Sequence, residues 1–596
     1  MAGGKHVIVI GADIAGLVTA KVLHEDGFDV LVLDKAAHPG GVWIESRTYP
    51  GLRTNNSRHT YAFSDHPYPP SAPLFPTAPD VRAYLASYMD RFDLEPLLRL
   101  RTEVVRVSHA GNGVDGPDAG SGRAEKSVGS AGTSVDDTAV ESARTGAESD
   151  SAGAGSDRMR TAPDGVPADF DDGGEGFEVE VIGPAGRAIL RCDFVVVCAG
   201  VFSEPRVPVI AGAERFAGAR LHSSAASDPE LFAGKRVVVV GAGKSALDCA
   251  AWAAEHAADC TLVFRQPHWM VPRYLPGGSP ADVLLVSRFG EMLLPYHRMN
   301  RVERFLHGPG RIVPRLLWLF VGFACRILLP IPRILVPEHP MPAGIENVGL
   351  GHEFFRMVQR GRVDLRRDAI AATPGGSEIV LESGARMAAD VLVFATGWRQ
   401  SLSFLSPELE AAVRTDGRFR LYRHILPPTE QRLGFIGYAS STACQLGAEI
   451  SAHWLSQAFR GELDLPPVPE MQRETLRVAT WLAKVLPARS EGYFLGPYLS
   501  HHIDDLMRDM RLPTRRTGNI LTEYLDGFFP TRYRDLPAER RRAREGIAPQ
   551  PNPTYLTPAR AMAGLALLGS AYALVRRAKR PSNRAKRPSN TGPRRP

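Results

Sequence analysis

The stretch VIVIGADIAG, residues 7–16, decides the fold because it joins a hydrophobic strand to a glycine turn and the start of a helix. Gly11 ends the strand and Gly16 closes the turn, as in the G-x-G-x-x-G sequence that binds a dinucleotide pyrophosphate. The middle position of this turn holds Asp13 in place of glycine. Asp13 brings a side chain and a negative charge towards a dianionic group. We expect the turn still to bind a dinucleotide, at reduced affinity, with Asp13 turned outward or bridged through water.

The residues that flank this turn predict a βαβ unit. KHVIVIGA is typical of a buried strand, AGLVTAKVLHEDG of a helix that ends at glycine, and DVLVLDK of a second strand. Asp34 ends the second strand about twenty residues beyond the turn, where a carboxylate accepts hydrogen bonds from ribose hydroxyls. The sequence therefore predicts an α/β fold that begins with a doubly wound, Rossmann-like domain.

A second βαβ unit begins at KRVVVVGAGKSALDCAAWAAEH, residues 235–256, and continues into the strand CTLVFR. Its turn keeps Gly241 and Gly243, with Ala246 at the third position. Two such turns, each between a strand and a helix, indicate two dinucleotides. The strand in ADVLVFATGW (389–398) resembles CDFVVVCAG (192–200) and is interpreted as returning the chain to the first domain. We therefore predict that the second domain is inserted in the first.

Composition shifts divide the chain further. Residues 111–176 are acidic and rich in Gly and Ser, and they are predicted to be a disordered loop between two strands of a hairpin region. The predicted order is the first part of the first dinucleotide-binding domain (1–205), a second dinucleotide-binding domain (206–385) with an apolar helical insert (about 280–345), the second part of the first domain (386–500), a helical C-terminal extension (501–575) and a disordered basic tail (576–596).

Composition also excludes several classes of function. The chain has 596 residues, 44% hydrophobic and 23% charged, with a formal net charge of +6. It lacks a basic stripe with interleaved aromatic residues, so we expect no nucleic-acid partner. The six cysteines form no C-x-x-C pair and have no histidine at ligand spacing, so no metal site is predicted and the thiols are expected to be buried and free. Without a signal peptide before the first strand, a cytoplasmic location is expected.

Two apolar segments suggest contact with an apolar ligand or a membrane. LLWLFVGFAC (316–325) is interpreted as a buried helix or a wall of the substrate site, with Leu316 and Phe320 contacting an apolar substrate. AMAGLALLGSAYALV (561–575) runs into the basic tail. Both are shorter than the ~20 residues that a membrane span needs. The stretch 561–596 is predicted either to contact a membrane surface peripherally or to dock as a terminal helix.

Motifs along most of the chain resemble the flavin-containing monooxygenases, class B flavoprotein monooxygenases. They are the first glycine turn, HPGGVW (38–43), RTNNSRHTYAFSDHPYP (53–69), FAGARLH (216–222), GAGKSA (241–246), ATGW (395–398) and LGAEISAHW (446–454). The resemblance implies two Rossmann-like domains, one for FAD and one for NADPH. It covers the chain outside the acidic insert and the residues beyond about 500.

The resemblance also implies roles for single residues. The residues implied to bind FAD are Gly11, Asp13, Ile14, Ala15, Gly16, Asp34, Lys35, Gly41, Val42, Trp43 and Thr54, together with Asn55, which is the implied catalytic residue beside the flavin. Those implied to bind NADPH are Gly241, Gly243, Lys244, Ser245, Ala246 and Arg265, and the ATGW turn adds Thr396 and Gly397. The guanidinium of Arg265 is expected to pair with a 2′-phosphate, which favours NADPH over NADH.

The implied activity is that of an FAD-dependent NADPH monooxygenase of the N,N-dimethylaniline monooxygenase type. NADPH and O₂ would form a C4a-hydroperoxyflavin, which would oxygenate an amine nitrogen or a thioether sulfur of a small hydrophobic molecule. Two departures keep alternatives open. YPGLR (49–53) is typical of Baeyer–Villiger monooxygenases that act on ketones, and the signature that runs through Phe216, Gly218 and His222 ends in Ala226 where an aromatic residue is expected. Asp13 and Ala226 also suit a flavin-poor, non-catalytic relative.

Overall fold

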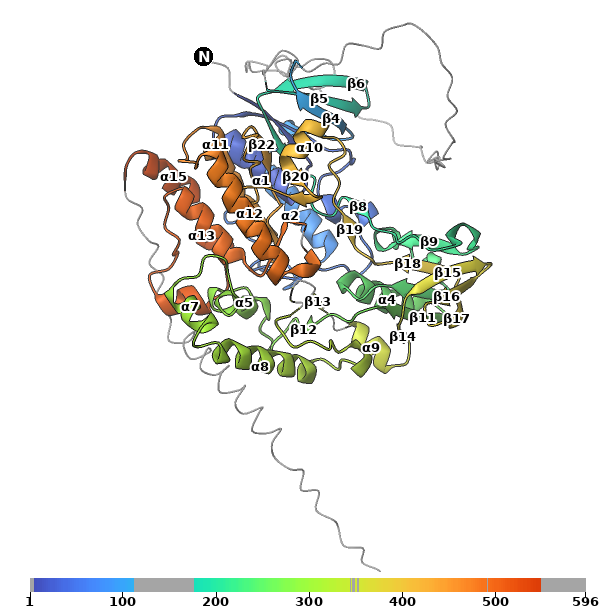
Figure 1. Ribbon diagram of the computed structural model, residues 1–596. Helices are drawn as coiled ribbons and strands as arrows, with labels where there is room; N and C mark the ends of the chain where they lie inside the picture. The colour runs from blue at the N-terminus through green and yellow to red at the C-terminus, as the bar shows by residue number, and fades with distance from the viewer. Residues whose placement is uncertain are drawn as a thin grey trace, which may run out of the picture.

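A computed structural model describes residues 5–111, 176–343, 345, 349–350, 353–489 and 491–547 (Figure 1). The acidic insert between Gly111 and Gly176, the apolar segment 561–575 and the basic tail lie outside the described residues. Predictions for these segments therefore stay predictions.

The first glycine turn belongs to a five-stranded parallel sheet. Its order is β22 (Leu433–Phe435), β7 (Phe194–Val197), β1 (His6–Ile10), β2 (Asp29–Leu33) and β3 (Leu98–Arg99). These strands are short apolar runs because helices cover both faces of a parallel sheet. Helix α1 (Ile14–Glu25) follows β1 and packs along α11 (Cys444–Phe459), a helix buried over most of its length. The pattern of residues 5–34 therefore predicted this unit correctly.

The second glycine turn belongs to another five-stranded parallel sheet. Its order is β14 (Asp364–Arg367), β11 (Asp259–Phe264), β10 (Arg236–Val240), β18 (Val391–Phe394) and β9 (Ala219–His222). Helix α4 (Lys244–His256) follows β10, and α9 (Glu353–Gln359) packs against it. The prediction of two Rossmann-like domains is confirmed.

The strand in ADVLVFATGW does not return the chain to the first domain, so this interpretation and the boundary at 386 were wrong. β18 pairs in parallel with β10 and β9 of the second sheet. The strand that rejoins the first sheet is β22, which pairs with β7. An apolar strand that ends in a small-residue turn occurs wherever a strand points at a nucleotide, so the pattern cannot tell which sheet the strand joins.

The chain crosses between the two sheets at two short strands. β8 (Glu204–Pro205) leads to the second sheet and β19 (Trp398–Arg399) leads back, and the two pair antiparallel with Trp398 opposite Pro205. The second domain is thus inserted in the first, as predicted, and a two-stranded ribbon joins them.

A three-stranded antiparallel sheet flanks the acidic insert. β4 (Glu103–His109) pairs with β5 (Phe177–Gly183), which pairs with β6 (Gly186–Cys192). His109 lies opposite Phe177, so the ends of the insert meet across one strand pair. The hairpin interpretation of this region is confirmed.

The remaining elements cover the sheets and build the C-terminal part. The helices are α2 (Ala78–Phe92), α5 (Asp282–Leu285), α6 (Arg288–Met292), α7 (Arg301–His307), α8 (Ile312–Leu328), α10 (Pro407–Val413), α12 (Val468–Val485), α13 (Leu499–Asp509), α14 (Ile520–Leu525) and α15 (Leu536–Arg544). The strands are β12 (Met270–Val271), β13 (Gly349–Leu350), β15 (Ile370–Gly375), β16 (Glu378–Leu381), β17 (Arg386–Ala388), β20 (Arg414–Thr415), β21 (Arg418–Phe419), β23 (Ser440–Ser441) and β24 (Phe494–Gly496).

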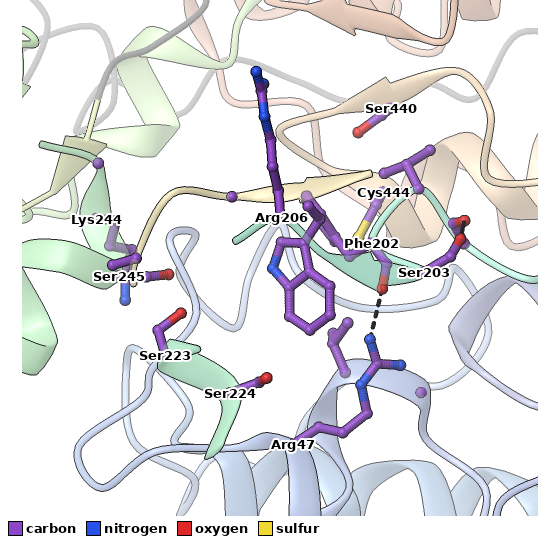
Figure 2. Close-up of a pocket in the computed structure, with 18 of the residues that line it drawn as sticks. Arg47, Phe202, Ser203, Arg206, Ser223, Ser224, Lys244, Ser245, Ser440 and Cys444 are labelled. Carbon is purple, nitrogen blue, oxygen red and sulfur yellow. Dashed lines mark hydrogen bonds between the residues drawn. The ribbon is translucent and has the colours of Figure 1, made fainter. Parts of the chain in front are cut away.

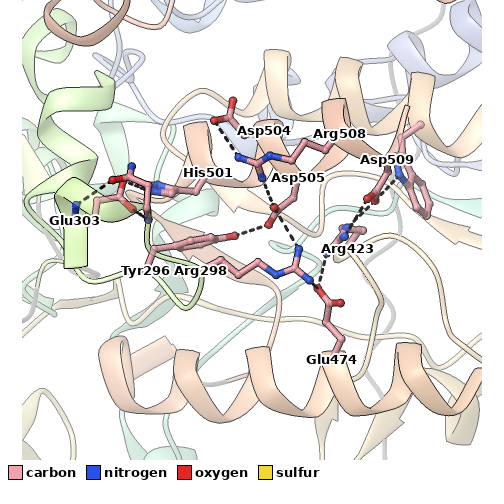
Figure 3. A network of polar contacts seen from close by, with 12 residues as sticks. Tyr296, Arg298, Glu303, Arg423, Glu474, His501, Asp504, Asp505, Arg508 and Asp509 are labelled. Carbon is pink, nitrogen blue, oxygen red and sulfur yellow. Dashed lines mark hydrogen bonds and ion pairs between the residues drawn. The ribbon is translucent and has the colours of Figure 1, made fainter. Parts of the chain in front are cut away.

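A buried polar network ties the apolar helical insert to the C-terminal extension (Figure 3). On α13, His501 lies between Glu291 and Glu303 at 3.0 Å from each. Although burial alone would lower it, these two carboxylates raise the pKa of His501 to about 9. Arg288 forms a bidentate pair with Asp504 at 2.7 Å. Since buried charges need such partners, the network fixes α6 and α7 against α13.

Candidate functional site

One cavity of about 2,780 Å³ connects the two glycine turns. Its lining comes from both sheets, from the ribbon of β8 and β19, and from α8. Figure 2 shows Lys244 and Ser245 of the second turn on one side and Ser203 and Cys444 on the other. A cavity of this size has room for more than one cofactor-sized molecule, since single ligand pockets usually measure roughly 300–1,000 Å³.

The glycines of the first turn are required by close packing. Gly11 has φ +109°, and a Cβ there would lie 2.5 Å from the carbonyl oxygen of Cys198. A Cβ on Gly16 would lie 1.8 Å from the carbonyl oxygen of Gly11. The turn thus packs against the end of β7 with no room for side chains. The adjoining residues Ile14 and Ala15 are buried in the first turn of α1.

Asp13 is the N-cap of α1, and this corrects the expectation that its side chain turns outward. Its Oδ1 accepts hydrogen bonds from the backbone N–H groups of Ala15, at 2.9 Å, and Gly16, at 3.1 Å. Burial, helped by the nearby charge of Asp34, raises the pKa of Asp13 to about 6, although the two hydrogen bonds act to lower it. A carboxylate of the protein therefore occupies two of the donors that a helix N-terminus offers to a pyrophosphate.

Asp34 already holds the backbone of the turn. Its Oδ2 accepts from the N–H of Ala12 at 2.7 Å, and its Oδ1 accepts from the N–H of Ala36 at 2.8 Å. Each carboxylate oxygen has a further lone pair for a ribose hydroxyl. Lys35 also lines the cavity, but it is exposed and lies 3.7 Å from Glu103.

The GGVW turn packs directly on Asp13. A Cβ on Gly41 would lie 2.6 Å from the Cβ of Asp13, and Gly41 itself has φ +59°. Val42 lines the cavity, and the indole of Trp43 donates to the hydroxyl of Tyr61 at 3.1 Å. The side chain of Asp13 thus fills space that a glycine at this position would leave beside Gly41.

The TNNS segment presents one of its two asparagines to the cavity. Thr54 is buried and its hydroxyl donates to the carbonyl oxygen of Asn56 at 2.7 Å. Asn56 is also buried and donates to Thr60 at 3.2 Å. Asn55 lines the cavity and is exposed, and its amide forms no hydrogen bond with another residue of the described ranges. The fold therefore leaves the amide of Asn55 available to a ligand.

The second glycine turn leaves the N-terminus of its helix open. Gly241 has φ +136°, and a Cβ there would lie 2.4 Å from the carbonyl oxygen of Ala395. Gly243 is the N-cap of α4 and no side chain of the described residues caps it. A Cβ on Gly243 would meet no described atom within 4 Å. Unlike α1, α4 thus offers free backbone donors to an anion.

The residues after Gly243 support this open turn. Lys244 pairs with Asp248 one turn along α4, and Asp248 also accepts from the hydroxyl of Tyr49 at 3.0 Å. Ser245 lines the cavity, whereas Ala246 is fully buried in the core of the second domain. Ala246 therefore packs the helix on the sheet and does not reach a ligand through its side chain.

Arg265 lies at the end of β11, on the wall of the cavity next to the second turn. It is exposed, and within the described ranges no ion pair or hydrogen bond of its guanidinium is found. Its neighbours Arg366 and Arg367 do have acidic partners, Asp364 and Glu338. Arg265 is thus the cation of this group that remains open to a ligand anion.

The ATGW turn joins the two crossings of the chain. The hydroxyl of Thr396 donates to the carbonyl oxygen of Arg206, and the carbonyl oxygen of Gly397 accepts from the N–H of Arg206 at 3.0 Å. Nε2 of His222 donates to the same oxygen at 3.0 Å. His222 of the FAGARLH motif therefore holds the turn that links the two domains. Thr396 and Gly397 of this turn line the cavity.

Two cavity arginines were missed from the sequence. Arg47 donates to the carbonyl oxygen of Phe202 at 2.6 Å and stacks 4.8 Å from the ring of Trp398. Its charge acts on Asp13 and lowers the pKa of that carboxyl, against burial. Arg206 lines the cavity from the ribbon. No local pattern marks either residue, because only the crossing of the two domains brings them to the cavity.

Helix α8 does form a wall of the cavity, but not through the residues expected. Trp318 and Val321 line it, whereas Leu316 is 58% exposed and Phe320 37% exposed on the outer surface. The prediction that Leu316 and Phe320 contact the substrate was therefore wrong. A run that is apolar on every face of a helix does not show which face points inward.

The sequence predicted no metal site, buried and free thiols, and apolar segments too short to span a membrane. The described part of the chain contains no group of three or more His, Cys, Asp or Glu residues suited to a metal ion. All six cysteines are free, and five of them are buried. Among the helices of the described segments, none is both long and apolar enough to cross a bilayer.

The comparisons with known proteins agree with this arrangement. The model of the flavin-binding monooxygenase-like family matches residues 175–305 and 347–507, and a model of NAD(P)-binding Rossmann-like domains matches residues 9–77. This chain belongs to the flavin-containing monooxygenase family. The resemblance drawn from its motifs is confirmed.

Individual relatives extend over most of the chain. A probable flavin-containing monooxygenase 1 of Arabidopsis thaliana is 26% identical over 566 residues, covering 89% of this chain and 96% of the relative. The structure of S-allyl-L-cysteine S-oxygenase from Allium sativum has a TM-score of 0.53 at 18% identity and covers 96% of this chain and 99% of its own. The OTEMO complex with FAD and NADP has a TM-score of 0.56 at 20% identity and covers 83% and 92%. The two structures show that the family fold is shared.

Proposed function

We propose that this protein uses FAD and NADPH to transfer one oxygen atom of O₂ to a nucleophilic nitrogen or sulfur of an apolar small molecule. The reaction consumes the substrate, O₂, NADPH and a proton, and it forms the oxygenated product, NADP⁺ and water. The observation that carries the proposal is the shared cavity, because it joins both glycine turns, Asn55 and an apolar wall.

The two turns fit their cofactors differently. The open N-terminus of α4, with Arg265 beside it, suits the phosphates of NADPH. The first turn suits the adenosine half of FAD through Asp34, and Arg47 supplies a cation near the pyrophosphate position. The carboxylate of Asp13, which accepts from the N–H of Ala15, would oppose a bound pyrophosphate. We infer that FAD binds here at a cost that the rest of the site offsets.

The chemistry of oxygen transfer would come from the bound cofactors: NADPH supplies the electrons and the flavin activates O₂. The protein residues would bind, orient and exclude water. The free amide of Asn55 would donate a hydrogen bond to, or accept one from, the groups brought beside it. Trp318 and Val321 would form an apolar wall of the substrate site. Such a wall favours uncharged, apolar molecules.

The purified protein, supplied with FAD, should oxidise NADPH in air and convert a thioether to its sulfoxide. An absorbance spectrum checks the flavin, and mass spectrometry with authentic standards identifies the product. A panel with a tertiary amine and a cyclic ketone separates the alternatives, since an ester or lactone from the ketone would identify a Baeyer–Villiger enzyme. A protein that takes up no flavin and oxidises no NADPH would instead be the non-catalytic relative.

The Asn55→Ala variant should continue to oxidise NADPH but form less product for each NADPH consumed. Loss of one hydrogen bond worth about 1 kcal/mol predicts roughly a fivefold fall in this ratio. Product and hydrogen peroxide are measured together, because oxygen that is not transferred appears as peroxide. The control is Ser46→Ala, another exposed residue of the same cavity. An unchanged ratio in Asn55→Ala would remove this residue from the catalytic site.

A further inference from the structure

The outer face of α8 is an apolar stripe that no described residue covers. Its residues recur every three or four positions, which places them on one side of the helix. They are Ile312 (57% exposed), Leu316 (58%), Leu319 (55%), Phe323 (48%) and Ile327 (52%), and Phe305 (57%) of α7 adds to them. Figure 1 shows α8 along an outer edge of the molecule, at the end opposite β4, β5 and β6. Large apolar side chains gathered in this way mark an interaction surface.

The exposed charged side chains of residues 301–337 are all positive. Residues 301–337 contain six arginines, all of them exposed, namely Arg301, Arg304, Arg311, Arg315, Arg326 and Arg333. None of the six forms an ion pair with another described residue, although the guanidinium of Arg326 stacks 5.3 Å from the ring of Trp269. The one acidic residue in this range is Glu303, which is buried and bound to His501. The surface therefore combines exposed apolar side chains with unneutralised cations.

The inner face of the same helix holds α8 in its place. Trp318 is buried and its indole donates to the carbonyl oxygen of Leu293 at 3.1 Å. Gly322 lies against the ring of Trp269, and Cys325 is buried beside them. Packing in the core of the molecule thus requires the apolar residues on one side of α8, but it does not require those on the outer side.

We propose that α7 and α8 form a membrane-binding surface that lies in the headgroup region of a bilayer rich in anionic lipids. The apolar stripe would enter the boundary with the acyl chains, and the arginines would contact lipid phosphates. The 17 residues of α8 measure about 25 Å at 1.5 Å per residue, so it would lie along the surface and not cross the bilayer. This surface is separate from the terminal stretch 561–596 and does not depend on the proposed reaction.

Flotation of the full-length, FAD-supplied protein with vesicles tests this surface. We expect binding to vesicles of phosphatidylcholine with about one third phosphatidylglycerol, little binding to pure phosphatidylcholine, and release at high salt because the arginine contribution is screened. The double variant Leu316→Glu/Phe323→Glu should lose at least about tenfold in partition coefficient. Arg311→Gln/Arg315→Gln should lose about 25-fold on the anionic vesicles alone, from about fivefold for each arginine.

Matched variants separate the α8 surface from the terminal segment and from a general effect of added negative charge. Ile182→Glu/Ile189→Glu changes two exposed isoleucines at the opposite end of the molecule and should bind like the wild type. Leu565→Glu/Leu568→Glu tests the terminal segment in the same way. Circular dichroism and flavin content confirm that each variant is folded. The proposal is overturned if the α8 variants bind as well as the wild type, if only the terminal variant loses binding, or if the α8 stripe proves to join two copies of the chain that do not bind vesicles.

Discussion

The Asp13→Gly variant should bind FAD roughly ten to a hundred times more tightly than the wild-type protein. The carboxylate of Asp13 accepts from the N–H groups of Ala15 and Gly16, which a pyrophosphate bound at this turn would otherwise use. Repulsion between single charges about 4 Å apart costs about 1–4 kcal/mol for effective dielectric constants of roughly 80 to 20. Removal of the side chain would free the N–H groups of Ala15 and Gly16 for the cofactor and would abolish this repulsion. The backbone at Asp13 is extended, with φ −91°, so glycine introduces no need to change it.

The same effect should appear as a pH dependence of FAD affinity. The pKa of Asp13 in the cofactor-free protein is about 6, and a bound pyrophosphate would raise it further because both are negative. The complex therefore holds more protons than the free protein at pH 7. Wild-type affinity should increase as the pH falls from above 7 and should level off below about 6. In Asp13→Gly this change should be absent.

Titration of the apoprotein with FAD at several pH values, followed by flavin fluorescence, measures both effects. Asp13→Asn is the informative control, since it removes the charge and keeps a side chain that can cap α1. Its affinity should fall between those of the other two proteins. Equal affinities in all three would mean that FAD displaces Asp13 at no cost. Weaker binding in Asp13→Gly would mean that the aspartate assists the cofactor.

The general fold could be predicted from short segments because each βαβ unit is local in sequence. The apolar strands, the glycines and the acid at residue 34 all lie within thirty residues of one another, and their packing repeats the sequence pattern. Membership of β18 in a sheet is not local. It depends on pairing with β10 more than 150 residues earlier, and any buried parallel strand has the same apolar composition.

Prediction of the candidate site from the sequence was likewise limited to features that are local in the chain. Gly241, Gly243 and Arg265 lie where their positions after a strand predict. The direction of the Asp13 side chain could not be predicted, because it follows from competition between a helix N-terminus, Gly41 and solvent. Arg47 reaches the cavity only because Phe202 and Trp398 come from the two crossings of the chain. A residue that reaches the site through contacts with segments distant in sequence cannot be recognised from a local motif.

The Arg265→Ala variant should lose most of its preference for NADPH over NADH. The exposed guanidinium at the end of β11 is the free cation beside the open N-terminus of α4. Loss of even one charge-assisted hydrogen bond to a 2′-phosphate costs about 1.5–3 kcal/mol, so KM for NADPH should rise at least roughly 10- to 100-fold. KM for NADH should stay within about twofold, because NADH carries no phosphate at this position.

Steady-state oxidation of both coenzymes by the FAD-supplied protein measures the effect. Arg366→Ala is the matched control, since Arg366 is exposed on the neighbouring strand β14 and already pairs with Asp364. Arg265→Lys should be intermediate, because an ammonium keeps the charge and loses the planar pair of donors. A parallel rise of KM for NADPH and NADH in Arg265→Ala would show that the arginine supports the fold of the site. An unchanged KM for NADPH would place the 2′-phosphate elsewhere, with the exposed Arg206 of the ribbon as the next cation to test.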